Sequence, residues 1–204
     1  MKFSSKLVEE AVEAMSSLPS IGKKTALRLI IHLIQSDSEK SERIATALTM
    51  LKSGIKECAN CHNISDNEIC EICSDPRRNA NQICVVETIR DIMAIEATEH
   101  YQGHYHVLGG VINPIEGIGI EHLKIKSLID RVNQIQNPEL IMALSPTIEG
   151  DTTVYFISKQ LQNPSIQIST IARGVSFGGE LEYADELTLG RSIISRVPYH
   201  TQKY

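Results

Sequence analysis

The spacing of apolar residues divides the chain into two parts. In the first quarter, apolar side chains recur every three or four positions, which predicts helices over residues 5–18, from residue 23 onward, and over about 39–53. We expect the third helix to pack on the first two through its apolar side. Ser36 and Glu39 have the spacing of a capping box at its start.

Beyond about residue 80, short apolar runs alternate with helical patterns. The runs predict strands at 83–87, 105–108, 140–144 and 166–171, and the stretches between them predict helices at 88–99, 121–132 and 152–161. Strands that alternate with helices pair in parallel. We therefore predict an α/β fold, with a parallel sheet flanked by helices and small modules before it. Functional side chains are expected at the carboxyl ends of the strands.

A tight turn separates the first two helices. Pro19 disfavours helix for the residue before it, and Gly22 can adopt a positive φ. Two helices joined in this way resemble the helix-hairpin-helix module, in which the start of the second helix holds a DNA phosphate. The residues expected to bind DNA are Gly22, Lys23, Lys24 and Arg28. Ser20 stands where that module usually has glycine, and a purely structural hairpin with solvated lysines is the alternative.

The stretch CANCHNISDNEICEIC contains two Cys-x-x-Cys pairs. Thiolates at this spacing can converge tetrahedrally on one structural zinc ion, with Cys58, Cys61, Cys70 and Cys73 as ligands. The segment is too polar to form a core of its own, so metal binding would supply its folding energy. His62 could compete as a ligand, although four cysteines already satisfy zinc. Cys84 lies in an apolar run and is expected in the core.

Carboxylates gather where predicted strands end. Glu87 closes the first strand, and Glu149 and Asp151 follow the third. This pattern resembles the Toprim domain of primases and topoisomerases, whose catalytic members hold Mg²⁺ with an early glutamate and a later Asp-x-Asp pair. Ser145 and Thr147 stand at the two aspartate positions, so we expect the shell of a metal site without catalysis. The alternative is a Mg²⁺-dependent Toprim nuclease or primase-like enzyme that uses the three remaining carboxylates.

Composition and charge narrow the possibilities. The 204 residues are 42% hydrophobic, which suits a packed globular protein of one or two domains. Net charge is −5, yet residues 1–56 carry an excess of three positive charges, so phosphate attraction should be sought there. No apolar leader or membrane-length run is visible, and we expect a cytoplasmic protein with metal-bound cysteines. Three histidines flank a predicted strand and are expected in surface or interface packing: His100, His104 and His106.

The order of these motifs resembles one bacterial family, the RecR recombination proteins. Two further stretches, LGGVINPIEGIGIEHL and GVSFGGELEYADELTLGRSI, add to the resemblance. It implies a helix-hairpin-helix module over residues 1–56, a four-cysteine zinc finger over 57–80, a Toprim-like domain over 81–177 and an oligomerisation segment over 178–204.

The resemblance also implies a non-enzymatic role in DNA repair. RecR proteins form a ring-like tetramer and act with RecO and RecF to load the strand-exchange recombinase on gapped DNA. The resemblance implies sequence-independent binding of single- and double-stranded DNA, and a partner surface that includes Glu87, Glu149 and Asp151. A protein scaffold whose hairpin serves only as an oligomer contact is the third possibility.

Overall fold

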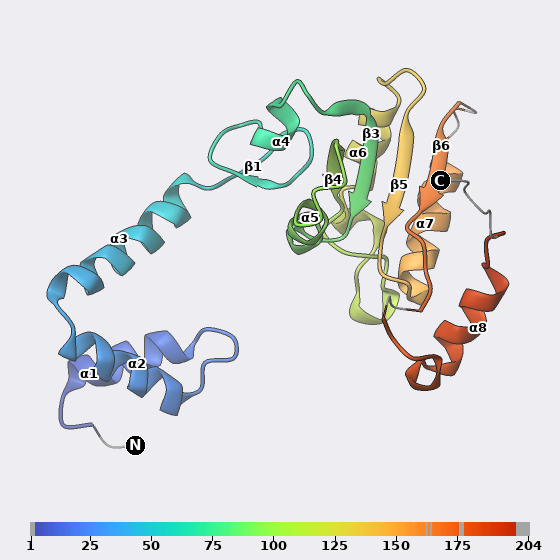
Figure 1. The fold of residues 1–204 in the computed structure, drawn as a ribbon. Coiled ribbons are helices and arrows are strands. Elements are labelled where there is room, and N and C mark those ends of the chain that lie inside the picture. The colour runs from blue at the N-terminus through green and yellow to red at the C-terminus, as the bar shows by residue number, and fades with distance from the viewer. Residues whose placement is uncertain (1–2, 162, 164, 176–177, 199–204) are drawn as a thin grey trace, which may run out of the picture. The chain divides into compact units, whose positions relative to one another are not determined.

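The computed structural model describes residues 3–161, 163, 165–175 and 178–198, shown as a ribbon in Figure 1. The chain divides into two compact units, residues 1–55 and 56–204. Within the described ranges, no helix has the length and apolar character needed to cross a membrane.

The first unit consists of three helices. They are α1 (Lys6–Ser16), α2 (Lys23–Gln35) and α3 (Ser38–Gly54). Ser5 caps α1 by accepting a hydrogen bond from the N–H of Val8. The two first helices pack around Val12, Ala26 and Ile30, all of which are buried. The helices predicted from the spacing of apolar residues are thus present, with α1 ending two residues early.

The third helix departs from the prediction. No residue of α3 is buried, and its apolar side chains lie open to solvent, with Leu48 59% exposed. Within one chain, α3 does not bury its apolar side on the first two helices, so the predicted packing is wrong. The predicted capping box is also wrong, because Asp37 is the N-cap and the Ser36 hydroxyl donates instead to the carbonyl of His32 at 2.7 Å.

The second unit is built on a four-stranded parallel sheet of order β4-β3-β5-β6. Its strands are β3 (Asn79–Val86), β4 (Gly103–Val107), β5 (Glu139–Ala143) and β6 (Gln167–Thr170). The helices are α5 (Ile89–Glu96), α6 (Ile125–Val132), α7 (Ile148–Gln160) and α8 (Glu186–Ile194), with short 3₁₀ turns at Pro114–Glu116, Ile120–His122 and Leu181–Tyr183. The predicted α/β class and parallel pairing are confirmed.

Alternating side chains of β3 reach opposite faces of the sheet. Ile83 and Val85 join a core that α6 and α7 cover. Cys84 and Val86 join a second core on the other face, covered by α5. Both cores are closed, because the side chains of β3 that enter them are at most 2% exposed. The expected core position of Cys84 is confirmed.

The cysteine segment opens the second unit. It contains a two-stranded antiparallel pair, β1 (Lys56–Glu57) with β2 (Ile64–Ser65), followed by the short helix α4 (Glu71–Ser74). Ile72 of α4 packs against the sheet core that α5 covers. The segment is therefore part of the second unit's packing.

The register of the sheet brings three strand ends together. Val86 lies opposite both Val107 and Ala143, so β3, β4 and β5 end level with one another. The residues that follow these strands meet at one edge, as expected for the carboxyl ends of parallel strands. α7 begins at Ile148, four residues before its predicted start, because Thr147 caps it by accepting a hydrogen bond from the N–H of Gly150 at 3.1 Å.

Candidate functional site

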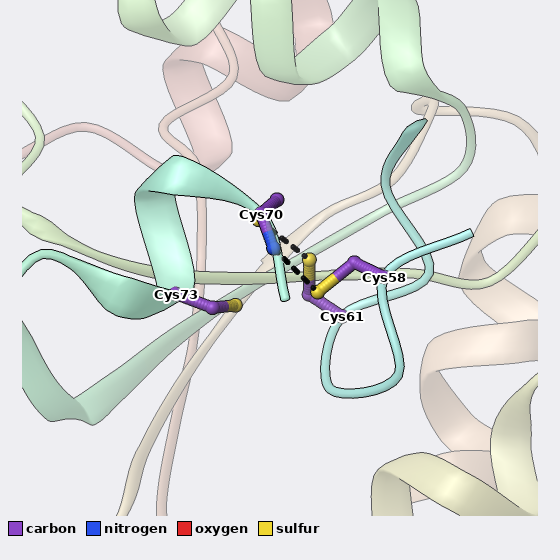
Figure 2. Close-up of side chains that lie close together, drawn as sticks. All are labelled: Cys58, Cys61, Cys70 and Cys73. Atoms are coloured by element: carbon purple, nitrogen blue, oxygen red, sulfur yellow. Dashed lines mark hydrogen bonds between the residues drawn. The ribbon is translucent and has the colours of Figure 1, made fainter. Parts of the chain in front are cut away.

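Four cysteine sulfurs converge in the segment before the sheet (Figure 2). The Sγ atoms of Cys58, Cys61, Cys70 and Cys73 all lie within 4.8 Å of one another. Those of Cys61 and Cys70 are 3.5 Å apart. Zinc–thiolate bonds of about 2.3 Å in a tetrahedron place sulfurs about 3.8 Å apart, so the cluster fits one zinc ion. Three of the cysteines are buried and Cys73 is half-buried, which leaves no wide opening for water.

Local backbone structure aims the first pair of sulfurs at the second. The N–H of Cys70 donates to the sulfur of Cys58 at 3.3 Å, which joins the two cysteine pairs. The knuckle that carries Cys61 turns at His62, whose φ of 63° is in the left-handed region. Both ring nitrogens of His62 face away from the sulfurs: Nδ1 is 2.6 Å from Oε1 of Glu57, and Nε2 is 2.8 Å from Oγ of Ser127. His62 therefore does not compete with the four thiolates.

The cysteine knuckle is fastened to the open edge of β4. The N–H of Val107 donates to the carbonyl of Cys61 at 2.8 Å. The guanidinium of Arg131 donates to the carbonyl of Asn60 at 3.2 Å and to that of Tyr105 at 2.7 Å. Since β4 is an edge strand, these bonds satisfy backbone groups that would otherwise face solvent. The cysteine knuckle thus covers the edge of the sheet at β4.

A second fastening follows the last cysteine. The guanidinium of Arg78 contacts both oxygens of Glu96 on α5 and donates to the carbonyl of Gly103 at 3.1 Å. The hydroxyl of Tyr105 donates to the same carboxylate at 2.6 Å. Burial raises the pKa of Glu96, but the bonds from Arg78 and Tyr105 lower it by more, so the net pKa falls. The carboxylate therefore stays charged and bonded at neutral pH.

The helical hairpin presents its cations to solvent. Lys23, Lys24 and Arg28 are exposed, and no ion pair engages them among the residues described. Gly22 is the N-cap of α2, with an extended backbone (φ −78°) and no side chain over the first N–H groups. Gly22 does not use the positive φ that glycine allows, because Ser20 takes the left-handed conformation of the turn with φ 66°. The four predicted residues nevertheless lie together on the first two turns of α2.

At the carboxyl edge of the sheet, the predicted carboxylates have separate partners. Oε1 of Glu87 accepts a hydrogen bond from the N–H of Ser145 at 2.5 Å. Oδ1 of Asp151 accepts one from Arg173 at 2.6 Å, and Arg191 lies 4.0 Å from the other oxygen. The bond from Arg173 lowers the pKa of Asp151. Glu149 is half-buried in the first turn of α7.

These three carboxylates do not form a metal cluster. Across the part of the chain that the structure describes, the four cysteines are the one group of metal-ligating residues close enough to share an ion. Glu87 is bonded to a backbone N–H and Asp151 is paired with arginine, so these carboxylates are directed at separate partners. The positions of the three carboxylates therefore suit a structural role at the carboxyl edge of the sheet.

Comparison with known proteins covers nearly the whole length of the chain. Family models match in chain order: the RecR helix-hairpin-helix over residues 8–51, the RecR four-cysteine zinc finger domain over 55–75, the Toprim domain over 81–172, and the RecR C-terminal region over 174–197. The Recombination protein RecR of Amoebophilus asiaticus is 56% identical over 200 residues, covering 98% of this chain and all of that protein. The chain belongs to the RecR family.

Other RecR proteins are as similar. That of Flavobacterium johnsoniae is 57% identical over 199 residues, covering 98% of this chain and 97% of its own length. That of Cytophaga hutchinsonii is 54% identical over 204 residues, the full length of both chains. The resemblance to RecR and to Toprim that the motifs indicated is confirmed.

The RecR zinc-finger match identifies the metal. It spans residues 55–75, the stretch in which the four sulfurs converge. The zinc cofactor predicted from the paired cysteines is therefore confirmed. Glu57 lies within the same RecR match. Its Oε1 is 2.6 Å from Nδ1 of His62 and accepts a hydrogen bond from Lys124, the N-cap of α6, at 3.1 Å, which helps to fix the knuckle beside the start of α6.

The sequence did not predict the positions of several residues in this RecR chain. Nothing in the local sequence marks Arg173 and Arg191 as partners of Asp151, because the contacts join positions 22 and 40 residues apart. The predicted surface placement of His106 is wrong: it is fully buried, with Nε2 2.9 Å from the carbonyl of Lys124. His104 is half-buried beside Arg131, and His100 is exposed as expected.

Proposed function

We propose that this protein is a non-catalytic, DNA-binding recombination mediator that acts in DNA repair. The observation that carries the proposal is the open start of α2, where Lys23, Lys24 and Arg28 are exposed in a chain of net charge −5. The names of the relatives, Recombination protein RecR, support it.

The hairpin binds the phosphate backbone of DNA. The first N–H groups of α2 lack a capping side chain, because Gly22 is the N-cap. Such groups, together with the positive end of the helix dipole, form an anion site. Lys23, Lys24 and Arg28 add charge around it. All of these groups contact phosphates and none contacts base edges, so binding to single- and double-stranded DNA is independent of sequence.

The Toprim-like domain does no chemistry on DNA. Thr147 uses its hydroxyl to cap α7, and Glu87 holds the backbone of Ser145. A Mg²⁺-dependent nuclease or primase-like enzyme would need several carboxylates converging on one ion. Glu87, Glu149 and Asp151 instead have separate surroundings, which favours the mediator over the enzyme.

The zinc ion has a structural role. Its ligands are Cys58, Cys61, Cys70 and Cys73, one ion per chain. A site with four cysteine ligands has no position left for water or substrate, so the metal stabilises the knuckle that covers β4. Along the chain, the protein consists of a helix-hairpin-helix module (1–56), the zinc finger (57–80), the Toprim-like domain (81–177) and an oligomerisation segment (178–204).

Partner proteins complete the activity. The protein forms a ring-like homotetramer in the cytoplasm and works with RecO and RecF to load the strand-exchange recombinase on gapped DNA. Exposed apolar side chains on α8, such as Ile194 at 79%, suit a subunit contact. Glu87, Glu149 and Asp151 contribute to partner binding. Glu149 has the most freedom for this, because the carboxylates of the other two are bonded within the chain.

Strand exchange on gapped DNA coated by single-strand-binding protein tests this function. Together with RecO and RecF, the parent protein should shorten the lag before the recombinase acts. Lys23→Glu combined with Arg28→Glu should restore the full lag while zinc content stays at one ion per chain. A double variant as active as the parent, or plasmid cleavage that requires Mg²⁺ and Glu87, would contradict the proposal.

A further inference from the structure

Side chains that carry N–H donors continue along α2 beyond the hairpin turn. Lys24, Arg28 and His32 recur every four residues and are all exposed. Ala26 and Ile30 occupy the opposite side and are buried against α1. At 1.5 Å per residue, the three side chains form a row about 12 Å long. The thirteen residues of α2 include no Asp or Glu, so no acid interrupts the row.

A lysine from the next helix stands at the end of this row. Nζ of Lys40, on α3, is 2.8 Å from Nε2 of His32, and both side chains are exposed. An ammonium group has only donors, so Nε2 of His32 is the acceptor in this contact. The two other N–H groups of Lys40 remain available to an outside acceptor. The ammonium is thus held where the row of α2 ends.

Acidic neighbours set the limit of the row. Asp37 and Glu39 border the same surface hollow as Lys40 and Arg43, so the surface beyond Lys40 is of mixed charge. Among the described residues, neither acid forms an ion pair with Lys40. The ion pair of the first unit joins Lys6 and Glu10 instead. The row of donors therefore extends from Lys24 to Lys40, and the surface beyond Lys40 carries both charges.

We infer that the DNA backbone follows α2 from the hairpin turn to Lys40, and that Lys40, positioned by His32, is an additional phosphate contact. This inference rests on the proposed DNA-binding function of the hairpin. Each residue of a DNA strand carries one phosphate, and a row of about 12 Å is long enough to contact more than one of them. The hairpin turn alone accounts for the first of them.

The salt dependence of DNA binding tests Lys40. Fluorescence anisotropy with a labelled duplex, at several salt concentrations, gives the slope of log affinity against log salt. Lys40→Gln should reduce the slope by about 0.9 and weaken binding several-fold at low salt. Lys52→Gln is the matched control, because it removes one exposed lysine from the same helix, α3, about three turns farther on. It should leave the slope unchanged.

Other outcomes distinguish the absence of a contact at Lys40 from the absence of DNA binding by the hairpin. If Lys24→Gln lowers the slope and Lys40→Gln does not, the hairpin binds DNA but the contact at Lys40 is disproved. Equal losses for Lys40→Gln and Lys52→Gln would also overturn the contact, since they would reflect net charge alone. If neither Lys24→Gln nor Lys40→Gln changes the slope, and Lys23→Glu combined with Arg28→Glu also binds like the parent, the hairpin itself does not bind DNA.

A double-mutant cycle tests the positioning role of His32. His32→Ala should weaken binding in the parent chain, because Lys40 then loses its acceptor. In the Lys40→Gln chain the same change should have no further effect. An equal loss in both backgrounds would show that His32 does not act through Lys40. Far-ultraviolet circular dichroism and zinc content confirm that each variant is folded.

Discussion

The carboxylate of Glu87 accepts a hydrogen bond from the backbone N–H of Ser145 at 2.5 Å, joining the ends of β3 and β5. The two residues follow paired strands, since Val86 lies opposite Ala143 in the sheet. In Toprim enzymes a carboxylate at this edge holds a metal ion. Here it holds the start of the loop that leads to α7, so the edge is fixed by the chain itself.

Glu87→Ala should destabilise the protein without any change in its response to Mg²⁺. A hydrogen bond to a charged group contributes about 1.5–3 kcal/mol, and the lower end applies because Glu87 is half-buried. Glu87→Gln retains an acceptor oxygen and should cost less. Urea unfolding with and without Mg²⁺ measures both effects. Stabilisation of the parent by Mg²⁺ that is lost in Glu87→Ala would mean that Glu87 is a metal ligand.

Removal of zinc should weaken the sheet as well as the cysteine segment. The knuckle carries the carbonyl of Cys61 to which Val107 of β4 donates, so loss of the metal uncovers that edge. Cys70→Ser should bind far less than one zinc per chain and unfold at lower urea, and chelation of the parent should do the same. Elemental analysis and urea unfolding provide the measurements. Chelated, zinc-free protein with an unchanged unfolding midpoint would refute the coupling.

Acid should destabilise the protein through His106. Burial lowers the pKa of His106 to about 3, whereas an unfolded histidine has a pKa of about 6.5. The stabilisation is therefore complete above pH 6.5 and is lost as pH falls from 6.5 towards 3. At pH 5 this one group should lower the free energy of unfolding by about 2 kcal/mol.

His106→Gln should flatten the pH dependence of urea unfolding between pH 7.5 and 5. His100→Gln, which changes an exposed histidine, should leave that dependence as in the parent. Zinc content at each pH shows that both variants keep the metal. A slope in His106→Gln identical to the parent's would assign the acid sensitivity to other groups.

Ser20→Gly should stabilise the hairpin. A residue with a Cβ atom at φ 66° is strained by about 1–2 kcal/mol, and the flexibility of glycine in the unfolded chain offsets part of the gain. We expect a net gain of about 0.5–1 kcal/mol. Ser17→Gly, at φ −73°, has no such strain to relieve and should destabilise.

The first unit contains no Tyr or Trp, so hydrogen exchange of the α1 and α2 amides is the suitable measurement. Slower exchange in Ser20→Gly and faster exchange in Ser17→Gly are the expected results. No slowing in Ser20→Gly would mean that the turn relaxes and that the left-handed serine is not strained.

Periodicity predicted the architecture well because it reflects burial within one chain. The alternation along β3 and the helical spacing in α2 both follow from contacts that the chain makes with itself. The zinc site was also predictable, since four cysteines at fixed spacing have few other uses. α3 was mispredicted for the same physical reason: its apolar side has helical period, but none of its residues is buried among the residues that the structure describes.

Long-range polar contacts could not be predicted. Whether Asp151 meets Mg²⁺ or Arg173 depends on how β6 pairs with β5, which no local pattern encodes. His106 follows the period of a strand and is buried beside Lys124 and His62, yet histidine alone does not indicate burial. Ser20 broke a family pattern, and only the backbone angle shows that serine adopts the glycine conformation.

DNA binding by the hairpin of α2 through phosphate contacts underlies the proposed function. The most direct test is the affinity of the oligomeric, zinc-loaded protein for labelled DNA at two salt concentrations, compared with Lys23→Glu combined with Arg28→Glu. We expect steeply salt-dependent, sequence-independent binding by the parent, with a slope of about 0.9 per duplex phosphate contacted, and no measurable binding by the double variant. A folded double variant that binds like the parent, with the same slope, would contradict it.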